Sequence, residues 1–198
     1  MESALGDDEL GAWYRENVEI LVVPFMDKDG VEQGDQGKNR KPHDHNRDYG
    51  EQGGIYATVR AFKDLVSSWA EGKLRIAMDM HCPYIKNGDT GEIIYFVGSR
   101  NQNNWRKVCS FSEILENSQR GPLTYSALNN LSYGRGWNTG ASGVLLGNAG
   151  WTSELPHILF GTSIEIPYAN AQGQEVNPGT AGLFGRDIAR AVKTFLLT

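Results

Sequence analysis

The sequence predicts an α/β domain in which helices flank a central, mixed but largely parallel sheet. Short and nearly continuous apolar runs indicate strands buried on both faces, as in parallel sheets. Amphipathic stretches with the helical period of about 3.6 residues alternate with these runs. The 24 glycines gather in the loops between the regular elements. The 198 residues therefore suit one domain over residues 1–198.

The first half of the chain is expected to form two helices and two strands. A short helix is predicted over residues 7–16, and a strand, EILVVPF, over residues 19–25. Residues 55–69 carry apolar side chains at helical spacing, and Gly72 stands where that helix should end. A second strand, LRIAMDMH, follows over residues 74–81 and ends in polar residues.

The second half continues the alternation. A strand, IIYFVG, is predicted over residues 93–98, and a less regular helix over residues 102–118. The run GTSIEIPY predicts a strand over residues 161–168. Apolar residues from Leu183 to Phe195 then repeat at helical spacing, with basic residues on the opposite face, which predicts a C-terminal helix.

Composition argues against several classes of function. A net charge of −5 and an isoelectric point near 5.4 are unlike a nucleic-acid or anionic-membrane binder. No run approaches the roughly 18 apolar residues of a membrane span, and the acidic first residues do not form a secretory signal. We expect no nucleic-acid or membrane partner. The compartment is unknown; cytoplasmic is the default, since a lost N-terminal signal would leave no trace. Cys82 and Cys109 are expected to be reduced thiols.

His81 is the first candidate for a functional residue. It ends the apolar run MDMH beside Asp79, and Pro83 turns the chain directly afterwards. A neutral imidazole at a strand end is suited to bind zinc, with a neighbouring carboxylate to orient it. The alternative is a buried structural histidine that is hydrogen-bonded to a loop.

Glu165 is the second candidate because it interrupts the apolar strand TSIEIP. A buried carboxylate is costly unless a cation or a metal ion compensates its charge. Such a glutamate serves either in acid–base chemistry, with a raised pKa, or in a buried ion pair.

The stretch KNRKPHDHNRDYG, residues 38–50, is the third candidate. Asn46 and Arg47 present an amide beside a planar guanidinium, which binds a carboxylate at two points. The alternative is an exposed basic loop. His43 and His45 have a spacing that suits a metal ion, but the surrounding lysines and arginines would repel a divalent cation, so a metal site is rejected here.

Together these motifs resemble the zinc metallocarboxypeptidase family, in a divergent, bacterial-type branch. PFMDKDGVEQGDQGKNRKPHDHNRDYG, residues 24–50, is similar to the family segment that runs from P-x-x-N-P-D-G-V to D-L-N-R. MDMH is similar to the strand that carries the third zinc ligand, and TSIEIP to the strand of the catalytic glutamate. The order and approximate spacing agree from about residue 12 to the final helix.

The resemblance implies a role for each matching residue. His81 would be a ligand of one zinc ion, and Glu165 the general base and acid. Asn46 and Arg47 would bind the terminal carboxylate of a peptide substrate. Arg40, or less suitably Lys38, would stabilise the oxyanion. The implied reaction is removal of C-terminal residues from peptides that have a free C-terminal carboxylate.

The sequence also departs from the family pattern. His45 replaces the usual leucine, and no tyrosine stands about twenty residues before Glu165, where the family has one. The family's His-x-x-Glu motif, which supplies the first two zinc ligands, has no counterpart before Val18. We therefore expect that the N-terminal strands are missing, that two ligands are absent from this chain, and that an exposed sheet edge permits self-association.

Three functions follow as hypotheses. The first is a zinc carboxypeptidase, of which this chain is an incomplete part and inactive alone. The second is a zinc deacylase of N-acyl amino acids, which uses a similar arginine and glutamate. The third is a metal-free module that binds carboxylates or peptides through Asn46 and Arg47 without hydrolysis.

Overall fold

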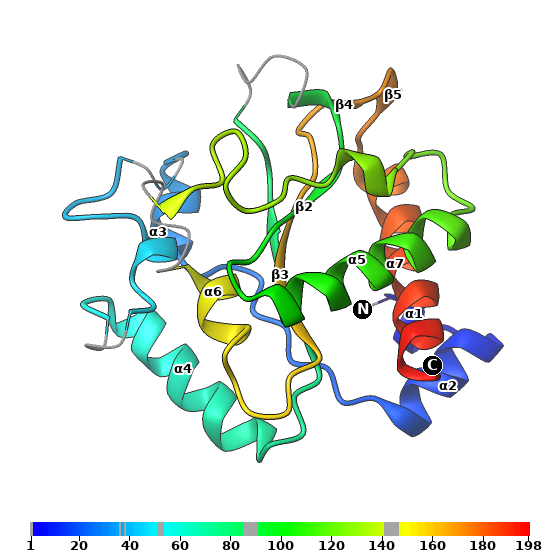
Figure 1. Ribbon diagram of the computed structural model, residues 1–198, viewed down its shortest axis with the longest axis horizontal. Coiled ribbons are helices and arrows are strands. Elements are labelled where there is room, and N and C mark those ends of the chain that lie inside the picture. Colours follow the sequence, from blue (N-terminus) through cyan, green and yellow to red (C-terminus); the bar gives the residue numbers. More distant parts are fainter. Residues whose placement is uncertain (1, 36, 38, 51–53, 85–90, 141–146) are drawn as a thin grey trace.

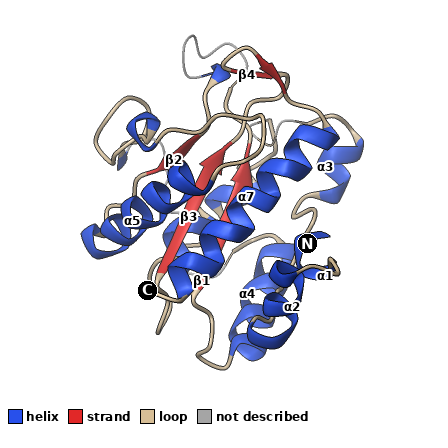
Figure 2. Cartoon of the chain, turned by 90° about the vertical axis from the view of Figure 1, so that its right-hand side faces the viewer, coloured by secondary structure: helices blue, strands red, loops and turns tan. Residues whose placement is uncertain are grey.

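The central sheet of this protein is small and mixed. The computed structural model describes residues 2–35, 37, 39–50, 54–84, 91–140 and 147–198 (Figure 1). Within them, helices surround three strands, β1 (Ile76–His81), β2 (Tyr95–Val97) and β3 (Phe160–Glu165), as Figure 2 shows. The strand order is β1-β3-β2, with β1 parallel and β2 antiparallel to β3. The α/β class and the mixed sheet are confirmed, while the described residues do not show a large parallel sheet.

The apolar run at residues 19–25 forms no strand, so that prediction was wrong. Ile20, Val22 and Phe25 are 46%, 46% and 59% exposed. A run with high β propensity becomes a strand only where a neighbouring backbone supplies hydrogen bonds. No described strand pairs with this run, and its apolar side chains stay at the surface.

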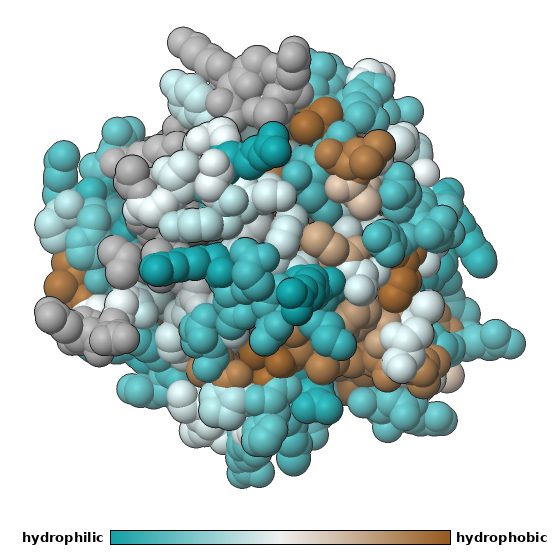
Figure 3. Space-filling model, viewed as in Figure 1, coloured by the Kyte–Doolittle hydropathy of each residue, from teal (hydrophilic) through white to brown (hydrophobic). Residues whose placement is uncertain are grey.

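Strand β1 is not buried on both faces, which is a second correction. Its residues are mostly half-buried, and Met80 is 56% exposed. β1 ends the strand order, so one of its edges has no described strand beside it. β2, by contrast, is buried throughout. In the view of Figure 3, apolar side chains reach the surface in several places, most broadly across the lower middle and the right.

The predicted helices are present. They are α2 (Glu9–Asn17), α4 (Ala57–Ala70), α5 (Gln102–Ser118) and α7 (Pro178–Leu196). Helix α4 ends where expected, because Glu71 and then Gly72 adopt positive φ angles of 44° and 78°. Helix α7 begins earlier than predicted, at Pro178. A capping box between Asn177 and Thr180 fixes this start.

Short elements connect these helices and strands. They are α1 (Glu2–Leu5), α3 (Lys28–Glu32), α6 (Asn148–Thr152), the 3₁₀ turns η1 (His45–Arg47) and η3 (Ala127–Asn129), and the hairpin of β4 (Asn170–Ala171) with β5 (Gln174–Glu175). Helices α1 and α2 pack beside α7, where the Tyr14 hydroxyl donates to the Ala189 carbonyl at 2.8 Å.

The core lies on one face of the sheet and leaves the other face for a site. Helices α5 and α7 cover the core face, where the Phe160 ring lies 5.1 Å from Phe111 and 5.4 Å from Phe195 between centroids. Alternate residues of β3 point to the opposite face. There α6 approaches closely, since a Cβ at Gly161 would lie 2.4 Å from the Thr152 hydroxyl.

Candidate functional site

A cavity of about 820 Å³ opens on the sheet face opposite the core. Five of the residues singled out as site candidates line it: Arg40, Asn46, Arg47, His81 and Glu165. Loop residues 40–44, 46 and 47 and the last residues of two strands therefore meet around one space. Lys38, the second candidate for an oxyanion-binding residue, lies outside the described residues.

Strand register places His81 beside Glu165. The two residues are partners at the ends of the parallel strands β1 and β3. Glu165 is 8% exposed. Neighbouring parallel strands lie about 4.8 Å apart, and partner residues point to the same face. An imidazole and a nearly buried carboxylate thus share the cavity wall.

His81 carries a positive charge at neutral pH. Burial favours its neutral form, but the hydrogen bond and charge of Asp79, together with the charge of Glu165, outweigh burial and raise the pKa of His81 to about 9. Its Nε2 lies 2.9 Å from the Asp79 carboxylate. Asp79 is thus the expected orienting carboxylate.

Hydrogen bonds hold the Asn46 side chain to two other parts of the site. Its Nδ2 lies 3.2 Å from Asp79 Oδ2 and 2.8 Å from His81 Nε2. With His81 protonated, both nitrogens are donors, and Asp79 is their shared acceptor. The Asn46 Oδ1 accepts from the Asn148 backbone N–H at 2.8 Å. The amide therefore joins turn η1 to β1 and α6, whereas the resemblance implied that it meets substrate.

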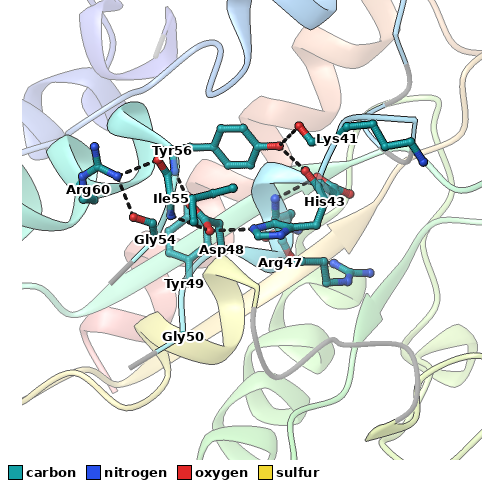
Figure 4. Close-up of polar contacts among 12 residues, drawn as sticks. Lys41, His43, Arg47, Asp48, Tyr49, Gly50, Gly54, Ile55, Tyr56 and Arg60 are labelled. Atoms are coloured by element: carbon teal, nitrogen blue, oxygen red, sulfur yellow. Dashed lines mark hydrogen bonds and ion pairs between the residues drawn. The ribbon is translucent and has the colours of Figure 1, made fainter. Parts of the chain in front are cut away.

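The two arginines differ in their surroundings. Arg40 donates to Asp27 at 2.6 Å and lies 3.7 Å from Asp35, so two carboxylates already compensate its charge. Arg47 donates through Nη1 to the Asn46 carbonyl at 2.7 Å. In Figure 4 its guanidinium points away from the neighbouring Asp48 cluster. Both arginines line the cavity, and Asp27 and Asp35 pair with Arg40 there.

The structure also brings residues to the cavity that the sequence did not single out for it. They are Lys41, His43, Tyr95, Arg100, Trp137 and Tyr168. Burial, and to a lesser extent the charge of Glu165, raise the pKa of Tyr95 to about 12, so its hydroxyl stays neutral. Tyr95 is the β2 partner of Glu165. Only the strand register reveals this neighbour, because the two lie seventy positions apart in the chain.

His45 lies away from the cavity wall. Its ring stacks on Tyr56 with centroids 3.7 Å apart and an angle of 17°. Its Nδ1 lies 3.4 Å from the Asp27 carboxylate. The rejected metal pair of His43 and His45 is accordingly split between the cavity and the interior of the loop.

The described residues do not by themselves fit a catalytic zinc ion. No three histidine, cysteine, aspartate or glutamate side chains in this part of the chain lie together so as to hold a metal. A catalytic zinc takes about three protein ligands. His81 offers one nitrogen, and its Nε2 already contacts Asp79. Both cysteines are free thiols, as expected.

In the described part of the chain, none of the helices is both long enough and apolar enough to cross a membrane. In comparisons with known proteins, no protein-family model matches the chain, and no curated protein matches it.

Proposed function

We propose that this chain binds the terminal carboxylate of peptides as part of a metallocarboxypeptidase-type hydrolase. One observation carries the proposal. The pairing of β1 with β3 places His81 next to the nearly buried Glu165, in the same cavity as Arg47. An anion-binding guanidinium thus faces the same space as a carboxylate suited to proton transfer.

Each residue has a defined task in this proposal. The Arg47 guanidinium forms two parallel hydrogen bonds with the carboxylate of a peptide, which fixes the position of the last amide bond. Glu165 takes a proton from the attacking water and returns it to the departing amine. His81 is the single zinc ligand that the described residues offer, so a metal ion would need further ligands from elsewhere.

A second candidate is the metal-free module that binds carboxylates without hydrolysis. The observation that favours it is the contact of His81 Nε2 with the Asp79 carboxylate at 2.9 Å, which engages one of the two ring nitrogens within the chain itself. Both candidates require Arg47 to bind a carboxylate.

Calorimetric titration tests both candidates at once. The ligands are an acetylated tripeptide with a free C-terminus and the same peptide with an amidated C-terminus. We expect the free acid to bind at least about tenfold more tightly. Arg47→Gln should abolish this preference. Arg106→Gln, which changes an exposed arginine on α5, should preserve it.

Hydrolysis then separates the two candidates. Release of the last amino acid in the presence of zinc, lost on chelation and in Glu165→Gln, would support the hydrolase. Binding that survives chelation, without any release, would support the module. Equal affinity for acid and amide would overturn both.

A further inference from the structure

The outer edge of strand β1 carries backbone groups that no described residue pairs. β1 runs parallel to β3, and the Arg75 and His81 carbonyls accept N–H groups from the chain of β3 at 2.7 and 2.8 Å. Along a parallel strand, alternate residues bond to opposite neighbours. The odd-numbered residues of β1 therefore bond to β3, while Ile76, Met78 and Met80 direct their N–H and C=O groups to the other side. None of these groups makes a hydrogen bond with a described residue.

The same edge is accessible. Figure 2 shows β1 on one side of β3 and β2 on the other. The described elements that pack most closely on β1 are β3 and α6, and α6 lies on the cavity face. Met80 is 56% exposed, and Ile76 and Met78 are half-buried. The strand IAMDMH has no lysine or proline, which protect many edge strands from pairing, so its outer edge can accept a further strand.

The backbone of this edge is complementary to itself in an antiparallel pair. In such a pair, alternate residues exchange two hydrogen bonds with the residue opposite. A two-fold axis at Met78 sets this residue opposite its own copy, and sets Ile76 opposite Met80. All of the outward-directed residues then occupy hydrogen-bonded positions, so their N–H and C=O groups are all paired. A two-fold dimer requires a surface that pairs with itself in this way.

The side chains also fit this register. The hydrogen-bonded pairs around the axis join isoleucine and methionine side chains only, and Asp79 comes opposite the small Ala77. Arg75 comes opposite His81 and diagonal to Asp79, so the carboxylate lies between two cations. An axis at Asp79 would instead set two carboxylates opposite each other, which is unfavourable. The charges therefore favour the axis at Met78 over an axis at Asp79.

We propose that two copies of this chain associate through the outer edges of β1, as an antiparallel pair about a two-fold axis at Met78. The occupant of the edge is thus a second copy. The two sheets join into one continuous sheet, with three described strands from each copy. Met80 and His81 also line the cavity, so the second copy lies beside the rim of the site. This inference does not depend on the proposed function.

The association should be weak and should depend on concentration. Stable protein–protein interfaces bury about 1,200–2,000 Å² in total. One short strand from each copy covers less than this, although its backbone pairing is complete. We therefore expect a dissociation constant of roughly 10–100 μM.

Sedimentation equilibrium of the whole chain, up to about 1 mM, measures this constant. The wild type is compared with Met80→Lys and with the control Leu128→Lys. Each variant adds a lysine at an exposed apolar position, one on β1 and the other on η3, where Leu128 is 95% exposed. A lysine on an edge strand opposes pairing, so Met80→Lys should dissociate at least about tenfold more readily. Leu128→Lys should match the wild type.

Isotope-filtered NMR of the wild type tests the register without any variant. In an equal mixture of labelled and unlabelled chains, the Hα atoms of Ala77 and Asp79 from different copies should show a nuclear Overhauser contact. These residues form a non-hydrogen-bonded pair, in which the Cα atoms lie about 4.5 Å apart. A chain that stays monomeric up to about 1 mM overturns the inference. So does a dimer that lacks this contact, or one that Met80→Lys leaves as tight as the wild type.

Discussion

Asn46→Ala should destabilise the protein, because the Asn46 amide joins three elements of the site. The short helix α6 has no side-chain cap from its own Gly147. Asn46 Oδ1 supplies the acceptor for Asn148 instead, at 2.8 Å. Loss of such a cap costs about 1 kcal/mol, and loss of the half-buried hydrogen bond to Asp79 costs about 1 kcal/mol more. The expected loss is about 2 kcal/mol in the free energy of unfolding.

Urea denaturation, followed by circular dichroism, measures this loss. The control is Asn103→Ala, which removes an exposed amide on the surface of α5 and should change stability by less than about 0.5 kcal/mol. If Asn46→Ala matches the control, the amide does not hold β1 and α6 together. It would then be available to a ligand, as the family resemblance implied.

Three further predictions concern the core, a buried carboxylate and the charge of the site. Phe160→Ala should cost about 3–5 kcal/mol, because its ring is fully buried. The control is Phe25→Ala, at an exposed ring, which should change stability by less than about 0.5 kcal/mol. Equal losses of unfolding free energy in the two variants, measured by urea denaturation, would contradict the assignment of Phe160 to the core. The fully buried Asp187 carboxylate accepts the backbone N–H groups of Arg120 and Gly121, each at 3.0 Å. Asp187→Ala leaves both groups without an acceptor, so we expect the free energy of unfolding in urea to fall by about 3 kcal/mol or more. A fall below about 1 kcal/mol would contradict this role of Asp187. The raised pKa of His81, about 9, adds stability that is fully present below the ordinary value of 6.5 and is lost as the pH rises through about 9. Unfolding free energies across this interval should fall, and an equal fall in His81→Gln would refute the assignment.

Local sequence patterns predicted most helices and strands, and the failures have physical reasons. Residues 74–81 and 93–98 each contain a shorter strand, and the strand predicted over 161–168 overlaps β3, which begins one residue earlier, at Phe160, and ends at Glu165. Residues 19–25 are just as apolar, but strand formation depends on a pairing partner that a local pattern does not contain. The early start of α7 at Pro178 could have been read from Asn177, since proline after a capping residue marks a helix start.

The candidate site was predictable in its strand residues and much less so in its loop. His81 and Glu165 are polar residues at the ends of apolar runs, and parallel pairing brings such ends together. The partner of His43 was not predictable. Its contact with Asp48 depends on how the loop folds back onto the N–H groups of Ile55 and Tyr56. The same folding turns His45 away from the cavity.

Among the strands of the described residues, β1 stands at the edge of the sheet, and this position has a consequence for dynamics. An edge strand is held by backbone hydrogen bonds on one side, so it can open locally while the core under α5 and α7 stays intact. Opening of β1 would separate His81 from Glu165 without global unfolding. The integrity of the cavity is then limited by the local opening of one strand. A ligand that spans the cavity would slow the amide hydrogen exchange of residues 76–81 more than that of the core helices.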